Sequence, residues 1–137
     1  VHVPMRTCPH AHMKTPIHPP NAAKPIAPYT PAIEANGVLY ISGQIALKGD
    51  SGELAMATIA EETKQVMEHI GILLRAAGLG YEHLVKMTVL LSDMSHFAAV
   101  NAVYATYFSG APPAREAYAV KGLPMGVNVE VSGIAVR

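Results

Sequence analysis

Two charged residues near the C-terminus have the types and the surroundings to do chemistry. Arg115 follows Pro112-Pro113-Ala114 and opens a segment whose next residues are mostly apolar. A guanidinium there is a rigid fork that can hold a carboxylate with two parallel hydrogen bonds. Glu130 lies inside a valine-rich segment, where a carboxylate without a partner is costly to desolvate. The residues alone leave two interpretations open: a site in which Arg115 binds a carboxylate, or an ion pair between neighbouring strands.

Other catalytic systems have little support. The sequence has neither a glycine-rich phosphate loop of standard spacing nor an HExxH motif. Cys8, His10 and His12 have C-x-H-x-H spacing, but they lie in a segment that we expect to be irregular, so we expect no metal site. We expect no cofactor either. The histidines on or beside predicted elements are interpreted as surface or edge residues: His69, His83 and His96.

The composition restricts the class of protein. A chain of 137 residues, 50% of them hydrophobic, fits one domain with one core. No apolar run approaches the roughly 18 residues that span a bilayer, so no membrane partner is expected. The formal net charge is zero, which gives no reason to expect a groove for nucleic acid. Cys8 is the single cysteine, which excludes an intrachain disulfide and fits the cytoplasm, with an organelle such as the mitochondrion as the alternative.

The N-terminal segment differs from the rest of the chain. Residues 1–25 contain six prolines and no acidic residue, and they show little periodicity. We therefore expect an irregular arm over 1–25 and a single domain over 26–137. Met13 is a plausible natural start, which would make residues 1–12 an added or upstream extension.

The hydrophobic pattern predicts the elements that would position these side chains. A short buried strand is expected at 38–41. A helix follows, in which Thr58 and Glu61 form a capping box and Gly78 marks the end. Its buried stripe has alternating spacings of four and three residues: Ile59, Thr63, Val66, Ile70, Leu73 and Ala77.

The second half of the chain predicts a strand, a helix and two further strands. The strand at 84–91 has four apolar residues on one side: Val85, Met87, Val89 and Leu91. Ser95 is expected to cap the second helix. The buried stripe of that helix would be Phe97, Val100, Tyr104 and Tyr107. The last two strands are expected around 115–120 and 127–136.

These elements predict an α+β fold of order β-β-α-β-α-β-β, a sheet with two helices on one face. In the last strand, Val129 and Val131 alternate with Glu130 and Ser132, so the uncovered face would carry polar groups beside apolar ones. Burying this face in a closed symmetric oligomer is the economical solution.

A series of ordered motifs accompanies Arg115 and Glu130. They are Pro28-Tyr29, Leu39-Tyr40-Ile41-Ser42-Gly43-Gln44-Ile45, Ala76-Ala77-Gly78-Leu79, Val85-Lys86-Met87-Thr88-Val89, Phe97-Ala98-Ala99-Val100-Asn101 with Tyr104, Pro113-Ala114-Arg115, Leu123-Pro124, Val129-Glu130-Val131 and Ile134-Ala135-Val136. In these motifs the chain resembles the Rid (YjgF-like, reactive intermediate deaminase) family, from about Pro28 to Arg137.

The resemblance implies a chorismate-mutase-like fold and a homotrimer with clefts between subunits. It also implies a 2-iminobutanoate/2-iminopropanoate deaminase, active in metabolite damage control. Such an enzyme hydrolyses 2-enamino or 2-imino acids, such as 2-aminoacrylate from pyridoxal-phosphate-dependent dehydratases, to 2-oxo acids and ammonia. Arg115 would anchor the substrate carboxylate, and Glu130 would orient or activate water. The substrate-binding residues implied are Tyr29, Ser42, Gly43, Asn101 and Ala117.

Ala117 departs from the family pattern, which usually has Cys, Ser or Thr two residues after the arginine. If only the shape and backbone matter at this position, alanine is tolerable; if a hydroxyl or thiol contributes, activity or substrate choice changes. Two rival functions are therefore kept. One is a non-catalytic metabolite-binding or regulatory module that uses the same cleft. The other is an RNA-directed translation inhibitor or ribonuclease, against which the neutral charge argues.

Overall fold

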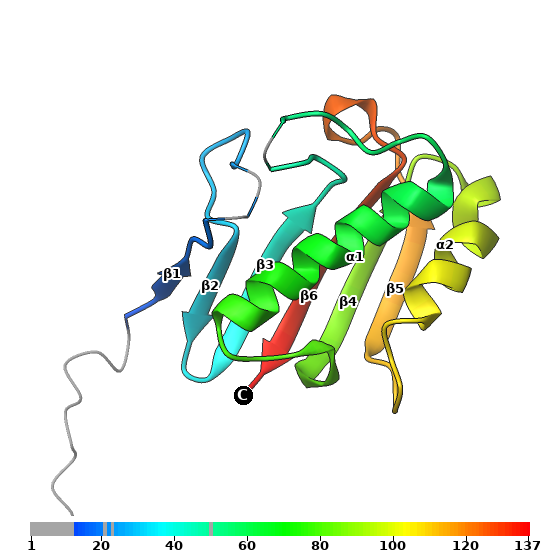
Figure 1. Ribbon diagram of the computed structural model, residues 1–137. Helices are drawn as coiled ribbons and strands as arrows, with labels where there is room; N and C mark the ends of the chain where they lie inside the picture. The colour runs from blue at the N-terminus through cyan, green and yellow to red at the C-terminus, as the bar shows by residue number, and fades with distance from the viewer. Residues whose placement is uncertain (1–12, 21, 23, 50) are drawn as a thin grey trace, which may run out of the picture.

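The computed structural model describes residues 13–20, 22, 24–49 and 51–137. They form a six-stranded sheet of order β1-β2-β3-β6-β4-β5, with α1 and α2 on one face (Figure 1). Neighbouring strands are antiparallel, except that β4 and β5 are parallel. The main elements are β1 (Thr15–Ile17), β2 (Ala32–Ala35), β3 (Val38–Gln44), α1 (Ile59–Ala76), β4 (Leu84–Leu91), α2 (Phe97–Ala105), β5 (Ala114–Ala119) and β6 (Val129–Val136). The predicted α+β class, with two helices on one face of the sheet, is confirmed.

β1 lies inside the segment that was predicted to be an irregular arm, and for these three residues that prediction is wrong. Thr15 is paired with Glu34, and Ile17 with Ala32, along the outer edge of β2. The edge of β2 offers unpaired backbone groups, and an edge strand tolerates Pro16 because a proline there need not donate to the ladder. Cys8, His10 and His12 lie outside the described residues.

The first helix follows the prediction closely. The backbone N–H of Glu61 donates to Thr58 Oγ1 at 3.0 Å, which confirms the N-cap. Gly78 has φ of 75°, the left-handed conformation that ends many helices. Of the predicted stripe, Ile59 is half-buried and the other members are buried. The pattern of three- and four-residue spacings therefore identified the face that packs on the sheet.

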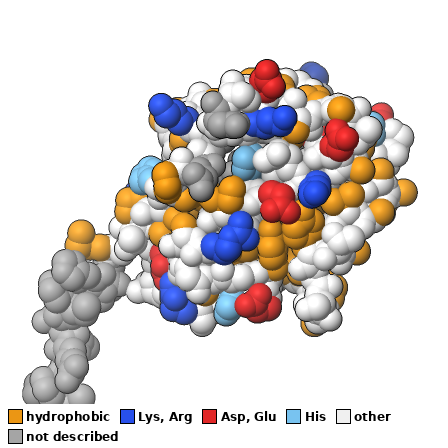
Figure 2. Space-filling model, viewed as in Figure 1, with side chains coloured by type: hydrophobic (Ala, Val, Ile, Leu, Met, Phe, Trp, Pro, Cys, Tyr) orange, Lys and Arg blue, Asp and Glu red, His pale blue; other side chains and the backbone are white. Residues whose placement is uncertain are grey.

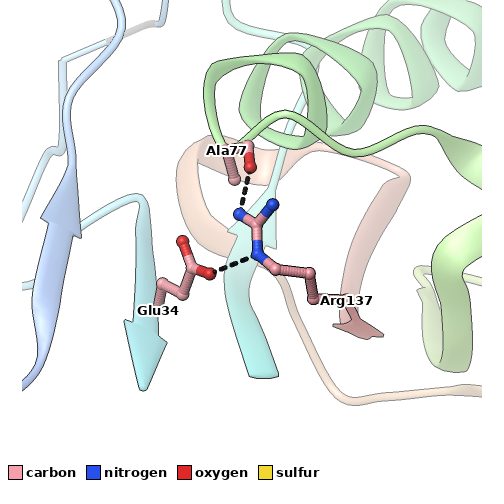
Figure 3. A network of polar contacts seen from close by, with 3 residues as sticks. All are labelled: Glu34, Ala77 and Arg137. Atoms are coloured by element: carbon pink, nitrogen blue, oxygen red, sulfur yellow. Dashed lines mark hydrogen bonds and ion pairs between the residues drawn. The ribbon is translucent and has the colours of Figure 1, made fainter. Parts of the chain in front are cut away.

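A C-terminal arginine ties three elements together at the other end of this helix. Arg137 Nε donates to Glu34 Oε1 on β2 at 2.9 Å, and its Nη2 donates to the carbonyl oxygen of Ala77 (Figure 3). The cation satisfies one of the last carbonyls of α1, where the helix dipole also favours positive charge. The end of β6 is thereby attached to both β2 and α1.

His69 was interpreted as a surface or edge residue, and the structure shows that this is wrong. Its side chain is buried on α1, with Nε2 at 2.7 Å from the carbonyl oxygen of Leu47. Burial lowers the pKa of His69, since the charged ring would be desolvated. The neutral ring is therefore a packing residue that also holds the loop after β3.

A buried carboxylate fixes the start of β6. Glu62, on the first turn of α1, is fully buried and accepts hydrogen bonds from the backbone N–H groups of Asn128 and Val129, both at 2.8 Å. Its other oxygen accepts from Asn128 Nδ2 at 3.0 Å. Asn128 Oδ1 in turn accepts from Ser92 Oγ at 2.8 Å, just after β4. These bonds set the position of the residues immediately before Glu130.

Two local details differ from the sequence prediction. Asp93, not Ser95, provides the cap at the start of the second helical segment, because its carboxylate accepts from the N–H of Ser95 at 2.8 Å. A short 3-10 turn (Met94–His96) then leads into α2. In β4, Val85 is exposed and Leu84 is buried instead. The register against β6 shifts between Leu84 and Lys86, and this irregularity reverses the alternation at the start of β4 only, because Met87, Val89 and Leu91 are buried as predicted.

The two faces of the sheet differ in character. The side facing the helices is buried and apolar, with Leu39, Met87, Val89 and Val131 in the core. The opposite face carries exposed or half-buried residues, including Tyr40, Thr88, Ser132 and Ile134 around a shallow hollow. No described helix covers that face, as Figure 1 shows. The mixed open face expected from the sequence is therefore present.

Candidate functional site

Tyr29, Ser42, Gly43 and Glu130 come together in one hollow of about 380 Å³. Ser42 and Gly43 lie near the end of β3, Glu130 lies near the start of β6, and Tyr29 comes from the loop before β2. The rest of the lining is mainly apolar: Ile26, Ala27, Ile45 and Pro124. These four predicted residues thus share one wall, with a carboxylate inside an apolar hollow.

The absence of a side chain at Gly43 is required by the position of Glu130. A Cβ atom at Gly43 would lie 2.5 Å from Glu130 Oε1, closer than van der Waals contact allows. Beside it, Ser42 Oγ donates to the carbonyl oxygen of Thr30 at 2.6 Å and so holds the loop that carries Tyr29. In this structure Ser42 therefore acts on the shape of the hollow.

The environment of Glu130 suits a general base. Burial raises the pKa of its carboxyl group, because the ionised form loses hydration. No lysine or arginine within the described residues lies within 4.0 Å of it. The carboxylate therefore keeps its proton affinity, as a group that must take a proton from water requires.

Arg115 lies elsewhere, on the edge strand β5, and faces the helices. Its guanidinium carbon lies 4.8 Å from the ring centroid of Tyr104 and 5.7 Å from that of Phe97, both on α2. Among the described residues no carboxylate lies within 4.0 Å of the guanidinium, and none accepts a hydrogen bond from it. This cation is thus held by aromatic rings, and its donors are available to an anion.

Two further predicted residues lie on the helix side with Arg115. Asn101 lies on α2 between Phe97 and Tyr104, at spacings that place all three on one helix face. Asn101 Oδ1 is buried, and no hydrogen-bond donor in the described part of the chain reaches it. Ala117, two residues after Arg115, packs against the core beside Val89. The unpaired acceptor of Asn101 thus lies on the helix face that carries the two rings against Arg115, where a donor from a ligand would satisfy it.

Within one chain, Arg115 and Glu130 do not meet. β4 lies between β5 and β6, with Arg115 opposite Met87 and Glu130 opposite Leu90. Met87 faces the helices and Leu90 faces the open side, so the two charged residues point to opposite faces of the sheet. The interpretation as an ion pair across neighbouring strands is therefore wrong for a single chain. Its error was to assume that strands adjacent in sequence are adjacent in the sheet.

Sequence reasoning missed the aromatic contacts of Arg115. Phe97 and Tyr104 were assigned only to the buried stripe of α2, yet both rings lie against the guanidinium. Their spacing with Asn101 was a signal for a shared face, but nothing local showed that Arg115 would pack on it. Nothing local showed either that Pro124, in the loop before β6, would line the hollow of Glu130.

Comparisons with known proteins agree with this arrangement. The family model described as endoribonuclease L-PSP matches residues 19–137. A 2-iminobutanoate/2-iminopropanoate deaminase from Mus musculus is 46% identical over 112 residues, which are 82% of this chain and 83% of the relative. The YjgF gene product of E. coli has a TM-score of 0.85 at 34% identity, covering 90% of this chain and 98% of that one. E. coli TdcF, solved with bound serine, has a TM-score of 0.86 at 31% identity, with the same coverage.

The sheet order, the two helices on one face and the extent of these matches define a YjgF-like protein. The chain belongs to the endoribonuclease L-PSP family, which is the Rid family that its motifs resemble. Some of its relatives are imine deaminases by name. No helix in the described part of the chain is long and apolar enough to cross a bilayer.

Proposed function

We propose that the protein hydrolyses 2-imino acids to 2-oxo acids and ammonia. The observation that supports this most is the pair of complementary half-sites: a cation without a carboxylate partner and a half-buried carboxylate without a cation. A 2-imino acid needs both, a cation for its carboxylate and a base for the attacking water. The deaminase named among the relatives, at 46% identity, supports the same reaction.

The two half-sites would be joined between copies of the chain. Arg115 lies on the edge strand β5, and Glu130 lies on the open face, so a neighbouring copy packed on that face could bring its own Arg115 to Glu130. A closed ring would form one such cleft at each boundary and would leave no open face. We propose a homotrimer, the assembly that the family resemblance implies.

The chemistry requires no covalent nucleophile, because the imine carbon is already electrophilic. Arg115 would hold the carboxylate, and Glu130 would accept a proton as the water oxygen bonds to the imine carbon. Transfer of this proton to the imine nitrogen gives a carbinolamine. The hydroxyl proton of the carbinolamine then moves to the nitrogen as the C–N bond breaks, which releases ammonia and leaves the C=O bond of the 2-oxo acid. Ala117 can contribute only shape and its backbone groups, so we assign it to the wall of the substrate cleft, with Tyr29, Ser42, Gly43 and Asn101 as the other binding residues.

The reaction can be tested by generating 2-iminobutanoate in place with a threonine dehydratase. Release of 2-oxobutanoate is measured against a semicarbazide trap, for the parent protein, Arg115→Ala and Glu130→Gln. We expect the parent to accelerate release, and Arg115→Ala to lose roughly 10- to 100-fold in kcat/KM because charge-assisted hydrogen bonds to the carboxylate disappear. No acceleration by a folded parent over several imino acids would refute deaminase activity.

Mixing the two impaired variants, Arg115→Ala and Glu130→Gln, tests whether the site is shared between copies. Arg115→Ala still carries Glu130, and Glu130→Gln still carries Arg115, so a mixed ring contains a cleft with both functional groups. Refolding the variants together should raise the activity above that of either variant, whereas each refolded alone should keep only its residual activity. A mixture no more active than its components would show that the two groups do not share a cleft between copies.

Ala117 supports one second candidate, a binding module that holds carboxylate metabolites without turning them over. This candidate predicts that 2-oxobutanoate binds to the parent and not to Arg115→Ala, while imine hydrolysis is not accelerated. The same preparations therefore separate the two functions.

A further inference from the structure

The guanidinium of Arg115 lies on an aromatic platform, which consists of Tyr104 and Phe97. The guanidinium carbon is 4.8 Å from the Tyr104 ring centroid and 5.7 Å from the Phe97 ring centroid. Both distances are within the range in which a cation is attracted to the face of an aromatic ring. In the part of the chain that the structure describes, these rings are the only groups with a recorded interaction with this cation.

The Tyr104 ring of this platform is held in place by the core. Tyr104 is buried, and its ring centroid lies 4.9 Å from that of Phe108, which packs against the core. Phe97 is partly exposed at the start of the same helix. Tyr104 therefore has little freedom to move, whereas Arg115 has a long side chain with several rotatable bonds that would cost entropy to order on binding. A fixed ring under the guanidinium lowers that cost.

An aromatic platform also suits this particular function better than a carboxylate would. A neighbouring carboxylate would order the guanidinium but occupy its hydrogen-bond donors and offset its charge. A ring orders it from the face and leaves the N–H groups at the edge free for a ligand. The contact is thus compatible with tight binding of an incoming carboxylate.

We infer that Tyr104 and Phe97 are positioning residues that hold Arg115 ready for the substrate carboxylate. This rests on the proposed function, in which Arg115 is the anchor. It assigns to the ring faces a role in affinity, and none to the Tyr104 hydroxyl, which is buried without a partner in the described residues. The contribution should appear in binding and KM more than in kcat, because the anchored carboxylate is not the reacting group.

The test compares Tyr104→Leu, Tyr104→Phe and Phe97→Leu with the parent. Binding of 2-oxobutanoate is measured by calorimetry, and kcat and KM are measured with imino acid made in place. Tyr104→Leu should raise both Kd and KM by roughly 3- to 30-fold with a smaller change in kcat, as expected for the loss of a partly desolvated cation–π contact. Phe97→Leu should have the same effect, smaller because Phe97 is farther away. Tyr104→Phe should bind like the parent, because it keeps the ring.

Tyr107→Leu is the matched control, since Tyr107 packs on Tyr81 at 5.0 Å between ring centroids and has no recorded contact with Arg115. It should leave Kd unchanged in folded protein. If Tyr104→Leu and Phe97→Leu both bind 2-oxobutanoate like the parent while Arg115→Ala does not, the platform is refuted and the anchor stands. If Tyr104→Phe loses as much affinity for 2-oxobutanoate as Tyr104→Leu, the hydroxyl and not the ring holds Arg115, and the inference is overturned. If Arg115→Ala itself binds normally, the proposed anchor fails.

Discussion

At the scale of single residues, the position of Glu130 depends on the lack of a side chain at Gly43. Glu130 can approach the backbone of β3 only because residue 43 has no side chain. The hollow that results is apolar, and burial there raises the pKa of the carboxyl group. The close packing of β3 and β6 at this point therefore determines both the position of Glu130, the proposed base, and its proton affinity.

Replacing Gly43 by alanine should displace Glu130. The new Cβ atom would lie 2.5 Å from Oε1, so the carboxylate must move by about an ångström. A displacement of that size can reduce catalysis by roughly 100-fold, and we expect a loss of tenfold or more in kcat/KM with the protein still folded. Gly122→Ala is the control, because nothing lies within 4 Å of a Cβ atom at that position. Full activity in Gly43→Ala would contradict a positioned Glu130.

The pH profile should report Glu130. Only the ionised carboxylate can take a proton from water, so activity falls as the pH drops through its pKa. Because burial raises that pKa, the acid limb of kcat/KM should begin at a higher pH than for an exposed glutamate. The residual activity of Glu130→Gln should lack this limb, whereas Glu61→Gln, at an exposed position on α1, should keep it. If Glu130→Gln keeps the acid limb of the kcat/KM profile unchanged, another group is responsible for that limb.

At the scale of elements, Glu62 joins α1 to the strand that carries Glu130. It is fully buried, and three N–H groups of Asn128 and Val129 donate to it. The carboxylate therefore acts as a structural acceptor between a helix and a strand that lie far apart in the sequence. A buried acceptor of this kind makes the register of β6 specific.

Glu62→Leu should destabilise the protein by about 3 kcal/mol, since the buried N–H of Val129 and the partly buried N–H of Asn128 would both lose their acceptor. Glu62→Gln keeps one acceptor oxygen, so its free energy of unfolding should fall by less. Urea unfolding at a fixed protomer concentration measures the difference, because stability of an oligomer depends on concentration. Equal stabilities of Glu62→Leu and the parent would show that water replaces the carboxylate without cost.

At the scale of the whole molecule, the open face of the sheet is the feature that a monomer leaves unexplained. Its residues are apolar and polar in alternation, and no described element covers them. On the helix-bearing face shown in Figure 2, acidic and basic side chains are interspersed rather than gathered by sign. The zero formal net charge agrees with this face, which presents no basic patch suited to a nucleic-acid backbone.

Ser132→Arg tests the role of the open face. Ser132 lies on that face with Lys86, so a second cation there should disrupt packing of another copy. We expect a smaller mass by sedimentation, loss of deaminase activity and an unchanged circular dichroism spectrum. Ser109→Arg, at an exposed position after α2, is the control. A Ser132→Arg protein with parental mass and activity would argue against assembly through this face.

The sequence by itself determined the local parts of this description. The period of its apolar residues located both helices and the strands β3 to β6, and Thr58 and Gly78 marked the limits of α1. Side-chain chemistry singled out Arg115 and Glu130, because a charged group in a mostly apolar strand is costly to desolvate unless it has a partner or a ligand. These features depend on neighbours within a few residues, so they are readable along the chain.

Only the tertiary structure decided how these parts meet. It inserted β4 between the strands of Arg115 and Glu130, placed Arg115 on Tyr104, and buried Glu62 and His69. It also added β1 to an edge that the N-terminal prolines did not suggest. Strand order and the contacts of a single buried charge depend on pairing between segments far apart in sequence. Periodicity says which side of an element is inside, but carries no information about which element lies against it.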